Sequence, residues 1–355
     1  MGVNTCVADV GKAACIACLA LLASWGSAAA QPVDSRDLPE GITPETKRAI
    51  DAGLAYLART QDRQGSWSNR GAYGGYPVAM TALAGLALLM DWNSTTQGRY
   101  APNVDRAARY LMRAARPDGL IANSDMEARP MYGHGFSMLF FGQLYGMTED
   151  ITRARQIHEV LNRAVRLTAR AQSPLGGWIY GPSSGGDEGS VTITQVQALR
   201  SCRNAGVEVP REVIDGAMEY LAMAQNSDGG IRYRAGTPGG SRPPLSAAAV
   251  CCWYNAGEYD NPRASKALEH CKNTLSPDAA YRGHDFYAHL YYAQALYIGT
   301  DPFWNEYFEK RRDYLLARQR QDGSWWGDNV GDIYGTAVAL IILQLPYNQL
   351  PLMQR

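Results

Sequence analysis

Residues 61–67 read QDRQGSW, and residues 319–325, near the other end of the chain, read QRQDGSW. Four more copies with the same internal spacing lie between them, at 115–121, 172–178, 225–231 and 275–281. Their last residues, at 67, 121, 178, 231, 281 and 325, are 44 to 57 residues apart. A nearly fixed period of this length indicates one supersecondary unit copied along the chain. The sequence therefore predicts six copies of one unit.

Each unit is predicted to hold two helices of different character. In 46–61 the apolar Ile50, Leu54 and Leu57 recur at helical spacing, and charged residues fill the other side. The second helix is apolar on every side, as in 81–89 and 336–343, so it must be buried all round. This alternation predicts an all-α fold, an (α/α)6 toroid with two concentric rings of helices. We expect the inner helices at 76–90, 131–146, 190–206, 244–257, 286–299 and 333–346.

The repeated stretch also predicts structural anchors. Its glycine is expected to end the first helix, because glycine enters the left-handed conformation without strain. The tryptophan two residues later is expected to pack against the turn, and the glutamine before it to bond the loop backbone. The predicted anchors are Gln61, Trp67, Gln172, Trp178, Gln225, Gln319 and Trp325.

The pattern Tyr-Leu-x3-Gln-x3-Gly-x-Trp is followed by a Gly-rich loop and, at 334–337, by Tyr-Gly-Thr-Ala. This pattern resembles the prenyltransferase and squalene oxidase repeat of terpenoid cyclases and protein prenyltransferase β subunits, with its QW-like motifs. The resemblance covers about 46–347, all six units. It implies an α/α toroid whose cavity lies at the N-terminal ends of the inner helices.

The catalytic residues of that family have no counterparts at the matching positions. Its cyclases use the middle Asp of Asp-x-Asp-Asp-Thr-Ala, but the most similar stretch starts at Asp332 and places Tyr334 there. A phenol with a pKa of about 10 cannot protonate an alkene. Ala248 and Val250 stand where the prenyltransferases hold zinc, and His289 alone cannot complete a tetrahedral site. The sequence predicts neither a metal nor a cofactor.

Residues that open the inner helices are expected to line the cavity. Tyr-x-polar triplets begin three of these helices, histidines there titrate near neutral pH, and toroid glycosidases use paired carboxylates at this end. Two structural alternatives remain open: the histidines bond a neighbouring loop, and the carboxylates cap helices. The candidate rim residues are His134, His289, Asp285, Tyr287, Asp332, Tyr334, Tyr132, Asp187 and Glu188.

The ends of the chain differ from its repeats. Residues 1–30 carry an apolar run at 13–25 and a small-residue site ending at Ala30, which is typical of a signal peptide. We expect a linker at 31–45, a tail at 348–355, and a periplasmic or extracellular location, with a retained membrane anchor as the alternative. Export permits a disulfide, although buried cysteines also act as small core residues. The cysteines concerned are Cys202, Cys251, Cys252 and Cys271.

Composition narrows the function classes. The chain has 355 residues, 46% of them hydrophobic and 19% charged, and its net charge is +0, so nothing favours nucleic acid as a partner. We expect a toroid that binds an apolar or isoprenoid-like ligand or acts as a scaffold, with an envelope protein as a candidate partner. The alternative is an enzyme, either a divergent terpene cyclase or a carbohydrate-active toroid that uses the rim carboxylates.

Overall fold

The computed structural model describes residues 1–2, 38–69, 71–72, 74–123 and 127–351. Leu38–Arg355 forms one compact unit. All but the first two residues of the predicted signal peptide, residues 31–37 of the linker and the last four residues lie outside the described residues. Within them, no helix is both long and apolar enough to cross a membrane.

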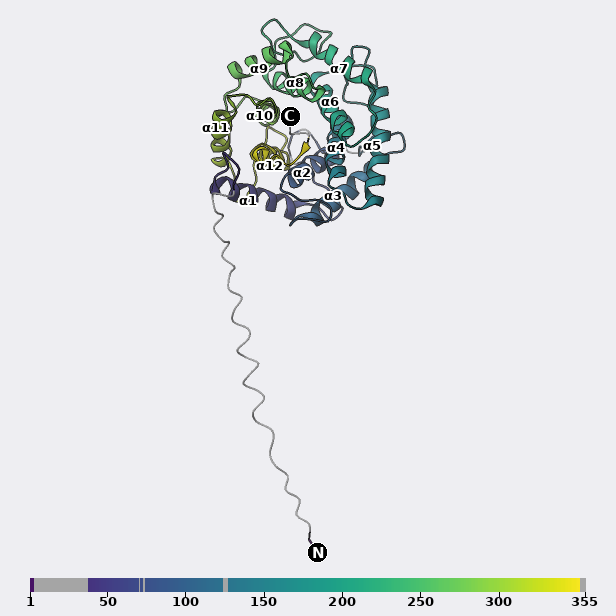
Figure 1. Ribbon diagram of the computed structural model, residues 1–355, viewed down its shortest axis with the longest axis vertical. Coiled ribbons are helices and arrows are strands. Elements are labelled where there is room, and N and C mark those ends of the chain that lie inside the picture. Colours follow the sequence, from purple (N-terminus) through teal and green to yellow (C-terminus); the bar gives the residue numbers. More distant parts are fainter. Residues whose placement is uncertain (3–37, 70, 73, 124–126, 352–355) are drawn as a thin grey trace. The chain divides into compact units, whose positions relative to one another are not determined.

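Twelve α-helices form two concentric rings in the described part of this unit, which has only isolated β-bridges and no strand (Figure 1). The outer helices are α1 (Pro44–Thr60), α3 (Ala101–Ala114), α5 (Ile151–Ala171), α7 (Arg211–Ala224), α9 (Pro262–Thr274) and α11 (Trp304–Leu316). The inner helices are α2 (Pro77–Leu89), α4 (Pro130–Gly146), α6 (Gly189–Asn204), α8 (Pro243–Ala256), α10 (Asp285–Ile298) and α12 (Asp332–Leu343). The predicted all-α (α/α)6 toroid is confirmed. Repeat 1 is α1 with α2, and so on to repeat 6, which is α11 with α12.

Burial separates the two rings as the sequence pattern requires. Every residue of α2 is buried, and so is all of α12 except its first residue. In α3, by contrast, buried residues recur every three to four positions and the remaining positions face outward. The inner ring therefore packs against the outer ring on one side and fills the middle of the toroid on the other.

The turn after each outer helix differs from the sequence expectation. Helix α1 ends at Thr60, and Gln61 adopts an extended conformation, so Gly65 does not end the helix. Instead Gly65 has φ +96°, and a Cβ there would lie 2.4 Å from the carbonyl oxygen of Arg106 on α3. The glycine is needed for this approach to the next outer helix. The Gln61 side-chain amide donates to the carbonyls of Gly65 (3.0 Å) and Asn103 (2.9 Å), which fixes the turn between two repeats.

The tryptophans lie deep in these turns. Trp67, Trp178 and Trp325 are at most 1% exposed. Each indole N–H donates at 2.8 Å to a carbonyl in or near the last turn of its own outer helix. The tryptophan therefore joins the end of an outer helix to the start of the following inner helix.

The same contacts close the ring between its last and first repeats. The amide of Gln319 donates to the carbonyl of Gly323 (3.0 Å) and to that of Ala49 (2.8 Å) on α1. The Asn69 amide reaches the carbonyl of Val330 at 3.3 Å. Repeat 6 is thus bonded to repeat 1 as its neighbours are to one another.

The cysteines of the repeats are buried free thiols without a disulfide among them: Cys202, Cys251, Cys252 and Cys271. The Cys251 thiol donates to the carbonyl of Tyr291 at 3.1 Å. Burial raises the pKa of each thiol. They act as small core residues, which was the second of the two sequence alternatives.

Candidate functional site

A cavity of about 370 Å³ opens at the N-terminal ends of the inner helices, and all six of these helices contribute to its wall. Its volume lies within the usual range for small-molecule sites. The deeper part of the wall is apolar and is formed by Ala79, Met80, Leu83, Phe136, Leu245 and Leu290. An apolar chain placed there would bury hydrocarbon surface against this wall.

Arginines surround the mouth of this cavity. Arg129 and Arg242 stand directly before α4 and α8, and Arg282 lies in the loop before α10. The Arg129 guanidinium lies 4.4 Å from the ring centroid of Tyr180, and that of Arg242 lies 4.9 Å from the ring centroid of Tyr233. Within the described residues, none of the three guanidinium groups has a carboxylate or hydrogen-bond partner. The mouth therefore carries three guanidinium groups without a close carboxylate among the described residues, and Glu188 interacts with Arg129 only at longer range.

Tyrosines form the wall between the mouth and the apolar floor. Tyr132, Tyr287 and Tyr334, three of the predicted rim residues, line the cavity. The Tyr132 hydroxyl lies 2.6 Å from Oγ of Ser190, whereas the Tyr287 hydroxyl is buried and has no hydrogen-bond partner among the described residues. Burial raises the pKa of all three phenols well above the ordinary value, so they stay neutral. They offer hydroxyl groups and aromatic faces, but no acid.

One carboxylate, Asp328, lines the cavity among the described residues, and the sequence analysis did not find it. Its two oxygens accept the backbone N–H groups of Phe286 (3.1 Å) and Tyr287 (3.2 Å) at the start of α10. Burial raises its pKa to about 6. Asp328 thus caps a helix of the preceding repeat, a role that sequence-local capping patterns cannot reveal.

No protein-family model matches the chain. Drimenyl diphosphate synthase of Streptomyces showdoensis is 26% identical over 236 residues, which is 66% of this chain and 40% of the relative. The chain thus spans less than half the length of this curated relative. Type II terpene cyclase MstE from Scytonema, in complex with its product merosterolic acid A, superposes with a TM-score of 0.61 at 16% identity, covering 85% of this chain and 97% of that chain. The chain has the fold of a terpenoid cyclase.

Other toroids share this fold. The GH76 α-mannanase of Bacteroides thetaiotaomicron has a TM-score of 0.62 at 9% identity, covering 85% of this chain and 95% of that one. The family resemblance inferred from the repeats is confirmed by the cyclase structures together with the drimenyl diphosphate synthase relative. At these identities the structural likeness establishes the fold alone, and the chemistry of this terpenoid-cyclase-like toroid must come from its own residues.

The predicted rim carboxylates do not face one another across the cavity. Glu188 caps its own helix, α6, by accepting the N–H groups of Ser190 (3.0 Å) and Val191 (2.6 Å). Asp187 accepts the hydroxyl of Ser173 at 3.2 Å in the adjoining turn. Their assignment to the rim is wrong. Each carboxylate instead accepts hydrogen bonds from backbone N–H or hydroxyl groups in a helix cap or turn.

Asp332 also lies elsewhere than predicted. Its Oδ2 accepts the hydroxyl of Tyr56 at 2.7 Å, and Tyr56 belongs to the outer helix α1. The position that matches the cyclase acid is Tyr334, which does line the cavity. The toroid thus presents a neutral phenol at the position that the Asp-x-Asp-Asp-Thr-Ala motif gives to an acid.

His134 proves to be a structural residue. Its Nδ1 accepts the backbone N–H of Ile121 at 3.2 Å, and its Nε2 lies 2.9 Å from Oγ1 of Thr168. It is fully buried behind the cavity wall, and this burial lowers its pKa to about 4. The predicted rim position is wrong, and the alternative of a bond to a neighbouring loop is the one observed.

The bond made by His134 occurs in every repeat. The backbone N–H of the last residue of each repeated stretch, here called the anchor N–H, donates to a side chain of the following inner helix. The distances range from 2.9 to 3.2 Å. The acceptors, from repeat 1 to repeat 6, are Thr81, His134, Thr192, Ser246, Asp285 and Thr336. A sequence comparison aligned on the inner helices would have shown that His134 occupies a threonine position.

Repeat 5 meets this requirement with a charge. Asp285 accepts the anchor N–H of Tyr281 at 2.9 Å and forms an ion pair with Arg311 of α11, whose Nη2 lies 2.6 Å from Oδ2. His289 is fully buried beside them, with Nδ1 2.9 Å from the hydroxyl of Tyr307 and Nε2 3.5 Å from Asp285 Oδ1. Burial lowers the pKa of His289 well below its ordinary value. Both predicted rim residues therefore belong to a buried cluster behind the wall.

The arginines at the mouth were missed by the sequence analysis. Two of them sit in Arg-Pro pairs, at 129–130 and 242–243, where proline opens an inner helix and the residue before it is held at the mouth. That pairing is a local signal that could have been read. As for metals, no group of three or more His, Cys, Asp or Glu side chains comes together in the described ranges.

Proposed function

We propose that this toroid binds an isoprenoid chain in its central cavity. The observation that carries the proposal is the apolar floor made by residues such as Leu83, Phe136 and Leu290, below a ring of neutral tyrosines. Burial of apolar surface contributes roughly 25 cal/mol per Å², so a flexible hydrocarbon chain gains more there than a sugar would. The Scytonema cyclase of this fold also forms a complex with geranylgeranyl dihydroxybenzoate, its substrate, which supports a prenylated ligand.

Binding without cyclisation is the form of this function that the residues favour. Protonation of an alkene needs a carboxylic acid that faces the ligand, and Tyr334 stands at the matching position. Asp328 reaches the wall, and burial raises its pKa to about 6, but both of its oxygens accept backbone N–H groups and so cap α10 rather than face a ligand. A carbohydrate-active role would use two carboxylates that face each other, and Asp187 and Glu188 are engaged in turns and caps.

The place of action is part of the same proposal. The leader expected at 1–30 supports export, and an exported isoprenoid-binding toroid would meet its ligand in the cell envelope, with or without an envelope protein as partner. Fractionation of cells that produce the full chain, with N-terminal sequencing of the mature protein, tests this part. A mature chain that retains residues 1–30 in the cytoplasm would contradict it.

Binding can be tested by filling the cavity. We expect wild-type protein to bind farnesol in calorimetric titrations, and Leu83→Trp to weaken that affinity at least tenfold, because the indole would occupy the floor. Ala79→Leu fills less of the space and should weaken binding by a smaller factor. Met223→Trp is the matched control, since Met223 is exposed on α7. Equal affinities for all four proteins, or no binding of farnesol by the wild type, would overturn the proposal.

A further inference from the structure

A second, smaller hollow adjoins the mouth of the cavity. It measures about 200 Å³ and is formed by the loop 233–242 that precedes α8, and we call it the annex. Tyr233 and Arg242 line both the annex and the main cavity. A ligand can therefore extend from the apolar floor past these two side chains into the annex.

The annex holds two arginines that are available to a ligand. The guanidinium groups of Arg234 and Arg242 lie 5.8 Å and 4.9 Å from the ring centroid of Tyr233. Within the described residues, neither side chain makes a hydrogen bond or an ion pair. Arg232, two positions away, differs: it donates to the side chain of Asn226 (3.0 Å) and the carbonyl of Ala235 (3.0 Å). The unused donors are thus a property of the annex rather than of every arginine in this loop.

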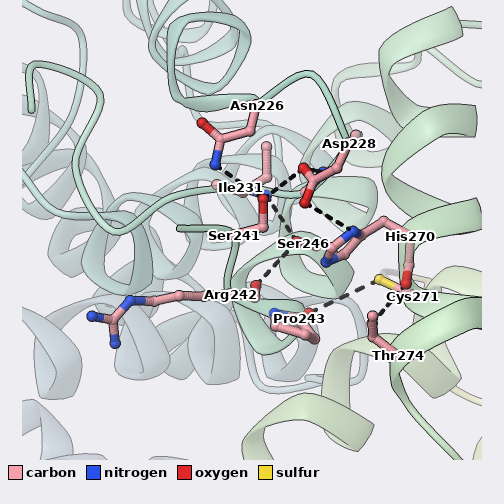
Figure 2. A network of polar contacts seen from close by, with 12 residues as sticks. Asn226, Asp228, Ile231, Ser241, Arg242, Pro243, Ser246, His270, Cys271 and Thr274 are labelled. Atoms are coloured by element: carbon pink, nitrogen blue, oxygen red, sulfur yellow. Dashed lines mark hydrogen bonds and ion pairs between the residues drawn. The ribbon is translucent and has the colours of Figure 1, made fainter. Parts of the chain in front are cut away.

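The base of the loop is held in place without these arginine side chains (Figure 2). Ser241 donates to Asp228 Oδ1 at 2.6 Å, and His270 Nδ1 lies 3.7 Å from Oδ2 of the same carboxylate. The backbone N–H of Arg242 donates to the carbonyl of Ile231 at 2.8 Å. In Figure 2 the Arg242 side chain points away from this network. Because the backbone that carries Arg242 is already held, binding costs less ordering of the loop, and mainly the side chains must be ordered.

We propose that the ligand is an anionic amphiphile, with a phosphate or carboxylate head group bound between Arg234 and Arg242 in the annex. The inference rests on the proposed function, which supplies the apolar tail. Guanidinium groups match these oxyanions with paired N–H donors. Arg129 and Arg282 add positive charge at the same mouth, whereas Asp328 is already engaged with α10. A neutral alcohol or hydrocarbon would form no ion pair with these guanidinium groups.

The experiment compares ligands that share a farnesyl tail and differ in their head group. Farnesol, farnesyl phosphate and the carboxylate farnesoate are titrated into wild type, Arg234→Ala and the control Arg211→Ala. The control removes one exposed charge from the N-terminal end of α7, whereas the annex loop follows the C-terminal end of that helix. We expect the wild type to bind at least one anionic probe more than tenfold more tightly than farnesol. Arg234→Ala should cut that ratio of Kd values at least fivefold, and Arg211→Ala should keep it. The anionic probe with the larger ratio identifies the head group.

A tail-free probe separates this inference from the proposed function. Inorganic diphosphate should raise the melting temperature of the wild type and of Arg211→Ala, but raise it less in Arg234→Ala. If farnesol fails to bind while diphosphate shows this dependence on Arg234, the annex stands and the isoprenoid proposal falls. If Arg234→Ala and Arg211→Ala respond alike to every anionic probe, the annex inference is wrong even when farnesol binds.

Discussion

Repeats 3 and 5 bond the anchor N–H to acceptors of different kinds. In repeat 3 the anchor N–H belongs to Trp178 and donates to the neutral hydroxyl of Thr192 at 3.0 Å, while the indole is buried and bonded to α5. In repeat 5 the anchor N–H belongs to Tyr281, and the acceptor is the charged Asp285. Tyr281 itself lines the cavity. In repeat 5 the residue at the tryptophan position therefore faces the cavity instead of packing in the core.

The charged acceptor of repeat 5 needs a partner of opposite charge. A buried carboxylate is costly unless it is paired and hydrogen-bonded, and Arg311 of the next repeat supplies the pairing at 2.6 Å. The Asp285–Arg311 pair joins repeats 5 and 6 with charge, whereas repeat 3 relies on apolar burial and neutral hydrogen bonds. A repeat can therefore place its anchor residue in the ligand site when the neighbouring repeat replaces the lost packing contact.

Truncating the buried tryptophan of repeat 3 is expected to have the largest effect on the free energy of unfolding. Trp178→Ala should lower the free energy of unfolding by about 5 kcal/mol, at the upper end for buried aromatic truncations, because the indole N–H bond to the carbonyl of Thr168 is lost as well. Trp178→Phe keeps most of the volume and should cost about 2 kcal/mol. Urea unfolding of the two variants measures both. Equal losses would show that the hydrogen bond, rather than the packing, holds the turn.

Removing the charged partner of Asp285 in repeat 5 should have the next largest effect on the free energy of unfolding. Arg311→Met leaves Asp285 buried without its partner and should cost about 4 kcal/mol. Lys310→Met, on the exposed side of the same helix, should unfold at the same urea concentration as the wild type. Adding Asp285→Asn to Arg311→Met should restore part of the loss, because a neutral amide needs no ion pair. Strictly additive losses in this cycle would contradict the paired role.

The smallest effect concerns the histidine that repeat 2 uses in place of threonine. The pKa of His134 is about 4 in the folded protein and about 6.5 in an unfolded chain. Between these values the unfolded chain binds more protons, so falling pH removes stability, by about 3 kcal/mol in total. His134→Thr should remove that loss, since repeats 1, 3 and 6 use threonine there. Unfolding free energies of both proteins at pH 7 and pH 4 give the difference, and a difference independent of pH would contradict the assignment.

The sequence predicted the toroid well and the site only partly, for physical reasons. The inner helices could be predicted because they recur at the spacing of the repeated stretch and are apolar on every side. A helix that is apolar on every side must be buried, so the sequence alone places it inside. Which way a helix-opening side chain turns depends on the partner it finds in the next repeat. Asp332 and His134 turn toward Tyr56 and Ile121, and periodicity cannot reveal these contacts. The three tyrosines reached the wall because a large aromatic at the third position of an inner helix has little other space.

The bonds from Gln319 to Ala49 and from Asn69 to Val330 have a consequence for how the molecule comes apart. An open stack of repeats can fray from its ends, and its stability is a sum over neighbours. A closed ring offers no end at which fraying can begin, so one broken junction leaves two unpaired faces at once. Residues 49 and 319 are 270 positions apart, yet loop-closure entropy grows only slowly with length. Circular permutants opened at any loop between repeats should therefore unfold as cooperatively as the natural order of helices.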